Sequence, residues 1–322
     1  MADHTGIEWA DATWNPIVGC SVLSPGCTNC YAMGMAARIE AMQPGSHYAG
    51  TTKPTKAGAV WSGKLALAPD HIITQPLHWS RPRRIFVNSM GDLFHEDAPD
   101  HWIDRVFAVM ALAPQHTFMV LTKRSARMRQ YLAEDRRNWR CASVDGLFPQ
   151  RTDASRQARD RLARLTAPGV PAPLENVWLG ASTERQAEWD ARVPDLKATP
   201  AVVRFISAEP LLGPIVGDFS LINLAIVGGE SGPKARPMHP DWARSLRDQC
   251  AAAGTAFFFK QWGEWRWAPD KAHFKELLED RWTRLASGRE GVRPALMVRE
   301  GKRAAGRLLD GVEHNAMPEA RS

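Results

Sequence analysis

Short apolar runs alternate along the chain with longer stretches that have helical periodicity. Six of the runs are rich in Val, Ile, Leu and Phe and end in small or polar residues, a pattern typical of parallel strands that are covered on both faces. A further strand is predicted within GIEWADATWN (6–15). The six runs are RIFVNSMGD (84–92), TFMVLTKRS (117–125), NVWLGAST (176–183), VVRFISAEP (202–210), LAIVGGESGP (224–233) and AFFFKQWG (256–263).

The stretches between the runs predict helices. DHWIDRVFAVMALA (100–113) has an apolar stripe at helical spacing, and DWARSLRDQCAAAG (241–254) has another and ends in a glycine that would stop a helix. Strands that alternate with helices form βαβ units and a parallel sheet. Because no G-x-G-x-x-G follows the first run, the pattern favours an α/β fold built as a parallel (β/α) barrel, complete or partial, over a doubly wound sheet.

The alternation of predicted strands and helices also predicts the domain organisation. We expect one barrel-like domain over residues 1–268 and a small, partly flexible C-terminal extension over 269–322, where the apolar runs become sparse. Residues 45–80 are rich in turn formers and contain VWSGKL (60–65), which predicts a hairpin. Residues from about 131 to 174 predict a helical insert that ends in a proline-rich linker.

Polar residues follow the predicted strands at the point where each strand ends. In a (β/α) barrel the C-terminal strand ends form one rim, and active sites lie on that rim. Carboxylates and ammonium groups there can move protons or hold charged ligands, and structural ion pairs are the competing interpretation. The candidate catalytic residues are Asp92, Lys123, Glu209 and Glu230, and the candidate cofactor-binding residues are Asn88, Ser89, Ser182, Gly228, Gly229 and Lys260.

Composition and charge restrict the cellular location and the partners that we expect. The chain has 41 Lys and Arg against 35 Asp and Glu, a net charge of +6 that permits contact with nucleic acid without requiring it. No apolar run approaches the ~20 residues that span a bilayer, and the N-terminus lacks a signal-peptide pattern. We therefore expect a cytoplasmic protein with no membrane partner. An odd number of cysteines, five, argues against a disulfide framework.

Three of the cysteines lie in one short loop (19–32) at the spacing C-x6-C-x2-C. Structural zinc normally takes four protein ligands, and only one C-x2-C pair is present. Three thiolates without an obvious fourth ligand suit a 4Fe–4S cluster that keeps one iron open. Cys20, Cys27 and Cys30 are therefore candidate metal ligands, with zinc and unligated thiols as the alternatives to iron.

Seven motifs of the chain, taken in order, resemble those of a known family. They are TWNPIVGCSVLSPGCTNCYA (13–32), FVNSMGDLFHE (86–96), LTKR (121–124), NVWLGAST (176–183), RFISAEPLLGP (204–214), VGGESGPKARPM (227–238) and FFFKQWG (257–263). In these motifs the chain is similar to a phage and prophage family defined by a three-cysteine motif, which is itself distantly similar to radical S-adenosylmethionine (SAM) enzymes.

The resemblance implies a radical-SAM-like enzyme with a 4Fe–4S cluster on the three cysteines and SAM as a second cofactor. It also implies a phage- or prophage-encoded protein of the host cytoplasm, with a nucleotide or nucleic acid as substrate and a protein partner as a further possibility. The usual spacing in radical SAM enzymes is C-x3-C-x2-C, so the first interval of this chain is longer by three residues.

Two other functions fit the same residues. One is a nucleic-acid-binding phage protein that is stabilised by zinc or by a cluster and has no catalysis of its own. The other is a divalent-metal-dependent hydrolase that uses Asp92, His95 and Glu230.

Overall fold

The computed structural model describes residues 5–134, 137–147, 152–164, 173–268 and 281–318. The chain divides into two compact units that are interleaved in sequence. Unit 1 comprises Met1–Leu23, Cys30–Ala181 and Pro194–Arg204, and unit 2 comprises Ser24–Asn29, Ser182–Val193 and Phe205–Ser322.

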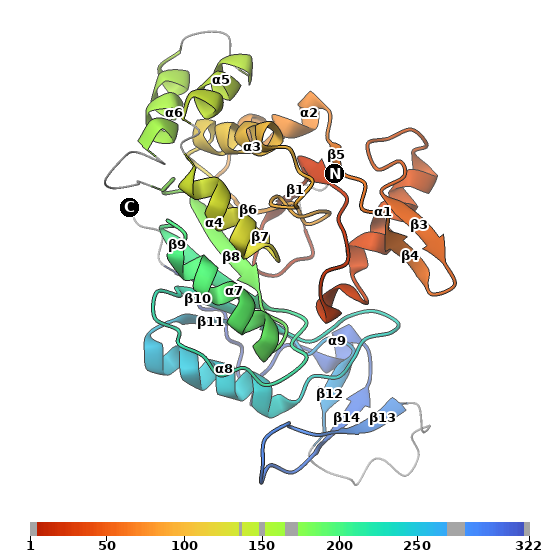
Figure 1. The fold of residues 1–322 in the computed structure, drawn as a ribbon. Helices are drawn as coiled ribbons and strands as arrows, with labels where there is room; N and C mark the ends of the chain where they lie inside the picture. Colours follow the sequence, from red (N-terminus) through yellow and green to blue (C-terminus); the bar gives the residue numbers. More distant parts are fainter. Residues whose placement is uncertain (1–4, 135–136, 148–151, 165–172, 269–280, 319–322) are drawn as a thin grey trace. The chain divides into compact units, whose positions relative to one another are not determined.

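Seven strands of the described residues follow one another in the order β1-β6-β7-β8-β9-β10-β11 (Figure 1). Their order in the sheet is their order along the chain, which is the winding of a barrel and not that of a doubly wound sheet. The pairings of β1 with β6, β6 with β7, β7 with β8, β9 with β10 and β10 with β11 are all parallel. The strands are β1 (Ala12–Trp14), β6 (Arg84–Val87), β7 (Thr117–Thr122), β8 (Val177–Ser182), β9 (Val203–Ala208), β10 (Leu224–Gly228) and β11 (Ala256–Gln261).

The sequence therefore predicted a parallel α/β sheet correctly, and each of the seven predicted regions contains its strand. The order is open, with β1 and β11 at its two ends, as in the partial form of the predicted barrel. Every residue of β8 and of β10 is buried, because both faces of these strands are covered.

In unit 1, helices α3, α5 and α6 pack against one another (Figure 1). The side chain of Arg140 on α5 is fully buried, 3.9 Å from the carboxylate of Asp104 and over the ring of Tyr131, so a buried cation fastens α5 to α3 and α4. The helices are α1 (Tyr31–Met42), α2 (Asp70–Ile73), α3 (Asp100–Leu112), α4 (Ser125–Ala133), α5 (Arg137–Leu147) and α6 (Asp153–Arg164).

Helices α5 and α6 lie where the helical insert was predicted, whereas most of the predicted proline-rich linker lies outside the described residues. Helix α7 (Gln186–Ala198) begins in unit 2 and ends in unit 1. Unit 2 also contains α8 (Pro240–Ala253) and the short α9 (Lys302–Ala305). Gly254 ends α8 in the left-handed conformation, as its sequence predicted.

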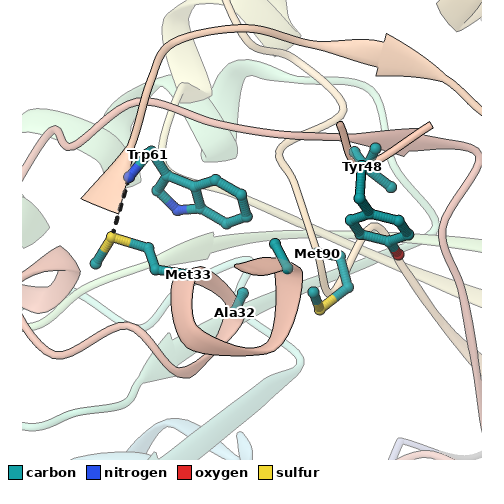
Figure 2. Packing of buried hydrophobic residues seen from close by; sticks show 7 residues of the cluster. Ala32, Met33, Tyr48, Trp61 and Met90 are labelled. Atoms are coloured by element: carbon teal, nitrogen blue, oxygen red, sulfur yellow. Dashed lines mark hydrogen bonds between the residues drawn. The ribbon is translucent and has the colours of Figure 1, made fainter. Parts of the chain in front are cut away.

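Unit 1 carries a hairpin of β3 (Thr52–Thr55) and β4 (Gly58–Trp61), and a pairing of β2 (Ile17–Val18) with β5 (Ala66–Leu67). The hairpin predicted at 60–65 is therefore displaced toward the N-terminus. The hydroxyl of Thr55 explains the position of the turn, because it accepts from the N–H of Ala57 and donates to the carbonyl of Gly58. The side chain of Trp61 and helix α1 then bury a cluster that includes Met33, Tyr48 and Met90 (Figure 2).

The C-terminal region of unit 2 forms an antiparallel sheet in the order β12-β14-β13. These strands are β12 (Trp265–Trp267), β13 (Trp282–Leu285) and β14 (Ala295–Arg299), and the pairing of β12 with β14 crosses the predicted boundary at residue 268. Residues 269–280 and 319–322 lie outside the described part of the chain. No described helix has both the length and the apolar character that crossing a membrane requires.

Candidate functional site

The predicted site residues follow C-terminal strand ends in both units. In unit 1 they lie after β6 and β7, and in unit 2 they lie at the ends of β8, β9, β10 and β11. Each unit brings its own set of polar residues to the edge where a parallel fold places ligands. Unit 1 holds Asn88, Ser89, Asp92 and Lys123, and unit 2 holds Ser182, Glu209, Gly228, Gly229, Glu230 and Lys260.

The carboxylate of Asp92 is buried and fully engaged. Its Oδ1 accepts from the hydroxyl of Thr122 at 2.6 Å and from the N–H of Phe94 at 3.0 Å, and its Oδ2 accepts from the N–H of Lys123 at 3.0 Å. Nη1 of Arg124 also donates to Oδ2, at 3.1 Å. Asp92 thus joins the ends of β6 and β7 and neutralises a buried cation.

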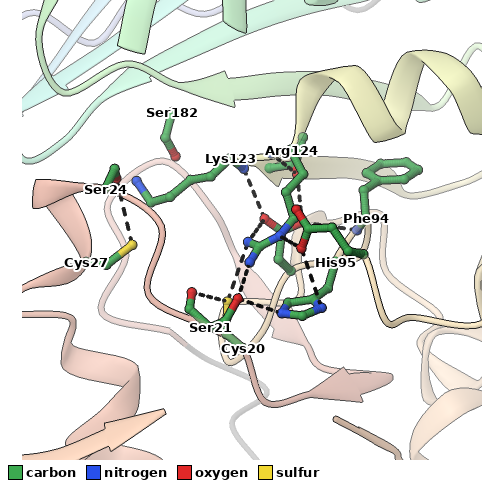
Figure 3. Close-up of polar contacts among 12 residues, drawn as sticks. Cys20, Ser21, Ser24, Cys27, Phe94, His95, Lys123, Arg124 and Ser182 are labelled. Atoms are coloured by element: carbon green, nitrogen blue, oxygen red, sulfur yellow. Dashed lines mark hydrogen bonds and ion pairs between the residues drawn. The ribbon is translucent and has the colours of Figure 1, made fainter. Parts of the chain in front are cut away.

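Arg124 connects this carboxylate to the cysteine loop (Figure 3). Its Nη1 donates to Sγ of Cys20 at 3.7 Å and its Nη2 to the hydroxyl of Ser21 at 2.7 Å. Burial would lower the pKa of Arg124, but the charges of Asp92, Cys20 and Glu96 outweigh burial and raise it. The guanidinium is therefore a permanent cation beside the sulfur, which favours a negatively charged sulfur at Cys20.

His95 holds the same loop as a neutral imidazole. Its Nδ1 accepts from the N–H of Asp97 at 3.1 Å, so its Nε2 carries the proton and donates to the hydroxyl of Ser21 at 2.8 Å. Burial, and after it the charge of Arg124, lower the pKa of His95. The imidazole of His95, with a side chain 2 % exposed, therefore positions the loop next to Cys20.

Asn88 and Ser89 connect the end of β6 to the turn after β1. Asn88 takes a left-handed φ of 58°, which asparagine tolerates, and its Oδ1 accepts from the N–H of Ile17. Its buried Nδ2 has no hydrogen-bond partner among the described residues. The hydroxyl of Ser89 and the N–H of Met90 both donate to Oδ1 of Asn15. Nδ2 of Asn88 is thus a donor left available at this strand end.

None of the five cysteines, all of which lie in the described residues, forms a disulfide, and two of the three in the loop share one environment in unit 1. Cys20 and Cys30 are half-buried against the apolar cluster of Figure 2. Cys30 is also the residue that precedes the first turn of α1, where the helix dipole favours a negative sulfur. No three His, Cys, Asp or Glu side chains of the described chain are grouped as a metal-ligand set.

Residues 24–29, which contain Cys27, belong to unit 2 and are held there by Glu184. Oε1 of this fully buried carboxylate accepts from the hydroxyl of Ser24 at 2.7 Å, and its Oε2 accepts from Nη1 of Arg192 at 2.8 Å. Sγ of Cys27 lies 3.8 Å from the same hydroxyl. A Cβ on Gly26 would lie 2.2 Å from Oε1 of Glu184, so the loop needs glycine at this position.

Glu230 holds the other end of this segment. Its carboxylate accepts from Nε and Nη2 of Arg236 at 2.8 and 2.5 Å, and from Nδ2 of Asn29 at 3.0 Å. Nη2 of Arg236 also donates to the carbonyl of Pro25. Burial would raise the pKa of Glu230, but the hydrogen bonds from Arg236 and Asn29 outweigh burial and lower it, so Glu230 is a carboxylate.

Lys260 and Glu209 form an ion pair at the ends of β11 and β9, with Nζ 2.5 Å from Oε1. The register of β10 and β11 shifts here, from Val227 beside Phe259 to Gly228 beside Gln261. Lys260 is the extra residue of this bulge, and bulges commonly redirect side chains next to functional sites. Oε1 of Gln261 and Oγ1 of Thr183, at the ends of β11 and β8, are buried polar atoms of unit 2 for which the described part of the chain provides no hydrogen-bond partner.

The two glycines have different roles. A Cβ on Gly229 would lie 1.9 Å from the carbonyl oxygen of Trp262, so the fold itself requires this glycine. A Cβ on Gly228 would contact Lys260 and Glu209 at ordinary distances, so Gly228 borders the ion pair. The carbonyl of Ser182 accepts from Nη1 of Arg192.

The sequence analysis missed the residues that hold the cysteine loop in unit 2. Glu184, Asn29 and Arg236 all lie inside the motifs quoted above or directly beside them, yet none was a candidate. The signal in the sequence that could have identified them was the presence of a charged or amide residue within a motif. Which carboxylate meets which arginine depends on contacts between residues far apart in sequence, such as Ser24 and Glu184.

Comparison with known proteins gives a family match. The model of a family described as "Protein of unknown function (DUF5131)" matches residues 4–318, which is nearly the whole chain. Neither the curated proteins nor the solved structures contain a match.

Proposed function

The chain belongs to the DUF5131 family, and from this premise we propose that it is an iron–sulfur protein, a radical-SAM-like enzyme that acts on a nucleotide or nucleic acid. Cys20, Cys27 and Cys30 would hold a 4Fe–4S cluster and leave one iron open to SAM. The phage origin and the cytoplasmic location implied by the resemblance belong to the same proposal, as does binding to a protein partner.

The contact of Arg124 with Cys20 carries this proposal. A buried guanidinium 3.7 Å from Sγ favours the thiolate, which is the form that binds a metal. Cys30, at the start of α1, has a second source of positive potential. Cys27 is three residues from Cys30, so covalent geometry keeps their Cα atoms within roughly 11 Å of each other.

The donor set fits iron and sulfide. Three cysteines stand in one segment of eleven residues, and none of them forms a disulfide. Of the other cysteines, Cys250 is fully buried in α8, and burial raises its pKa to about 12, so its thiol stays protonated and unreactive. When bound, a 4Fe–4S cluster supplies one-electron reduction, which radical SAM enzymes use to cleave SAM.

In this proposal some residues of the chain hold the cysteine loop, and others would bind the ligand. Arg124 and His95 hold the first cysteine in unit 1, and Glu184 and Glu230 hold residues 24–29 in unit 2. Glu209 and Lys260 are paired with each other, and they would exchange this contact for the ammonium and the carboxylate of a zwitterion such as the amino-acid end of SAM. The unpaired amide of Asn88 and the unpaired atoms of Gln261 and Thr183 are further groups for a ligand.

The same contacts make the hydrolase the weaker alternative. A divalent ion needs carboxylates that are open to it, whereas Asp92 is engaged by Arg124 and Glu230 by Arg236. Zinc in place of iron remains the second candidate, because the thiols suit either metal.

The test is made on anaerobically reconstituted protein. The reduced protein should give the electron paramagnetic resonance signal of a 4Fe–4S cluster, and the signal should change when SAM is added. Under the same reducing conditions SAM should be cleaved to 5′-deoxyadenosine. A signal that SAM leaves unchanged, without cleavage, would leave an iron–sulfur protein that is not a radical SAM enzyme; a variant with Cys20, Cys27 and Cys30 changed to Ala is the blank.

A further inference from the structure

The hairpin of β3 and β4 in unit 1 carries a local concentration of positive charge. Residues 41–69 contain three lysines, Lys53, Lys56 and Lys64, and no Asp or Glu. Lys53 lies on β3 and Lys56 in the two-residue turn, and both are exposed. Neither ammonium has a carboxylate partner within the described residues, so both charges face solvent without neutralisation.

The base of this hairpin is fixed, which keeps the lysines in place. Trp61 is buried against α1, and its backbone N–H lies 3.3 Å from Sδ of Met33 (Figure 2). Thr51, directly before β3, is fully buried and donates its hydroxyl to the carbonyl of Tyr48 at 2.7 Å. Nζ of Lys64 donates to the carbonyl of Ala49 at the same base, and it forms no ion pair with a carboxylate in the part of the chain that the structure describes. The acid nearest in sequence before these lysines, Glu40, accepts from the N–H of Gly50 at the base of the hairpin.

We propose that the β3–β4 hairpin binds the phosphate backbone of double-stranded DNA, with Lys53 and Lys56 as phosphate contacts. Lysines without counter-ions are the groups that release the counterions condensed on DNA, and this release is the main source of affinity in sequence-independent binding. The major groove of B-form DNA also admits a two-stranded β-ribbon, whereas the deep, narrow major groove of A-form RNA does not. The proposal does not depend on the cluster, because the phosphate contacts would be made by Lys53 and Lys56 on the exposed part of the hairpin, whereas Trp61 at its base belongs to the apolar cluster beside Cys20 and Cys30.

A second role for these residues makes a different prediction. Lysine and proline on an exposed strand discourage pairing with another chain, and Pro54 lies between Thr55 and Lys53 on β3. If protection of the edge were their only role, loss of the lysines would cause aggregation and leave DNA binding unchanged.

The experiment measures the affinity of the full-length chain for a labelled DNA duplex by fluorescence anisotropy over a series of salt concentrations. For the variant Lys53→Ala/Lys56→Ala we expect the slope of log K against log salt to become shallower by about 1.8, which is ~0.9 for each lost phosphate contact. Affinity at 0.1 M salt should fall by roughly 10- to 60-fold. The variant Lys53→Arg/Lys56→Arg keeps both charges and should bind as the wild type does.

The matched control is Lys302→Ala/Arg303→Ala, which removes two exposed charges from α9 of unit 2 and should keep the wild-type slope. Equal slopes for the wild type and the lysine variant would overturn the proposal, as would an equal loss in the control. Tighter binding to an RNA duplex of the same sequence, or binding to phosphatidylserine vesicles without binding to the duplex, would also overturn it. If the full-length protein binds no iron–sulfur cluster but still binds DNA through these lysines, the result would count against the proposed enzyme and leave this inference standing.

Discussion

Nη1 of Arg124 lies 3.7 Å from Sγ of Cys20, and both residues belong to unit 1. The guanidinium is itself held by Asp92, so the strand ends of β6 and β7 support the first cysteine through a buried ion pair. Residues 24–29 are supported in unit 2 in the same manner, by Glu184 and Glu230. The conformation of the cysteine loop therefore depends on buried charges as well as on its own glycines and prolines.

Replacement of Arg124 by Gln should destabilise the protein strongly. The side chains of Arg124 and Asp92 are 2 % and 6 % exposed, and removing one partner of a buried pair leaves the other charge without compensation, at a cost of about 3–5 kcal/mol. Denaturant unfolding monitored by circular dichroism measures the change. The control is Arg129→Gln, which breaks the exposed pair with Asp195 and should cost about 0–1 kcal/mol. Equal losses in the two variants would contradict this view of Arg124.

A pair of glycine variants tests the contact of the loop with Glu184. In Gly26→Ala the new Cβ would lie 2.2 Å from Oε1 and 2.5 Å from Cγ of a fully buried carboxylate, and we expect a loss of about 1–3 kcal/mol. In Gly34→Ala the new Cβ has no atom within 4 Å and stands inside α1, so we expect a gain of about 0.5–1 kcal/mol. The free energies of unfolding of both variants are compared with that of the wild type. An unchanged free energy of unfolding in Gly26→Ala would show that the loop does not need the close contact between Gly26 and Glu184.

His95 should make stability depend on pH. Burial, and then the charge of Arg124, lower its pKa in the folded state below the value near 6.5 of an unfolded chain. The stability that neutral His95 contributes is therefore complete above about pH 6.5 and is lost as the pH falls through the lowered folded-state pKa. The free energy of unfolding, measured between pH 7.5 and 5, should fall less steeply with decreasing pH in His95→Gln than in the wild type. The two slopes should differ by up to about 1.4 kcal/mol per pH unit.

The exposed His101 provides the control for this pH series. His101→Gln should keep the wild-type slope. The buried His116 and His239, whose pKa values burial also lowers, are present in both variants and cancel in the comparison. Identical slopes for His95→Gln and His101→Gln would rule out the neutral, buried state of His95.

The sequence predicted the strands well because their signal is local. Runs such as LAIVG (224–228) are apolar throughout, and a strand buried on both faces needs no other information. The position of the β3–β4 hairpin was predicted incorrectly, since the hydroxyl of Thr55 sets the turn ahead of the segment predicted at 60–65. Polar residues at strand ends were also predicted from local pattern alone.

The partners of those polar residues could not be predicted in the same way. Glu230 was expected at the rim as a catalytic group, and the contacts of Arg236 and Asn29 that surround it join positions 6 and 201 residues away in the chain. The insertion of Lys260 as a bulged residue depends on the register of two strands, which an apolar run such as AFFF does not specify. The change from an apolar run to polar residues thus identifies the strand ends, and the partners of those polar residues are determined only by the folded chain.

Iron, sulfide and zinc analysis of anaerobically purified protein tests the central claim most directly. We predict about four irons and four sulfides per chain in the wild type and in Cys141→Ala/Cys250→Ala, and neither iron nor sulfide in a variant with Cys20, Cys27 and Cys30 changed to Ala. About one zinc per chain without sulfide, or iron and sulfide retained after loss of the three loop cysteines, would contradict the account.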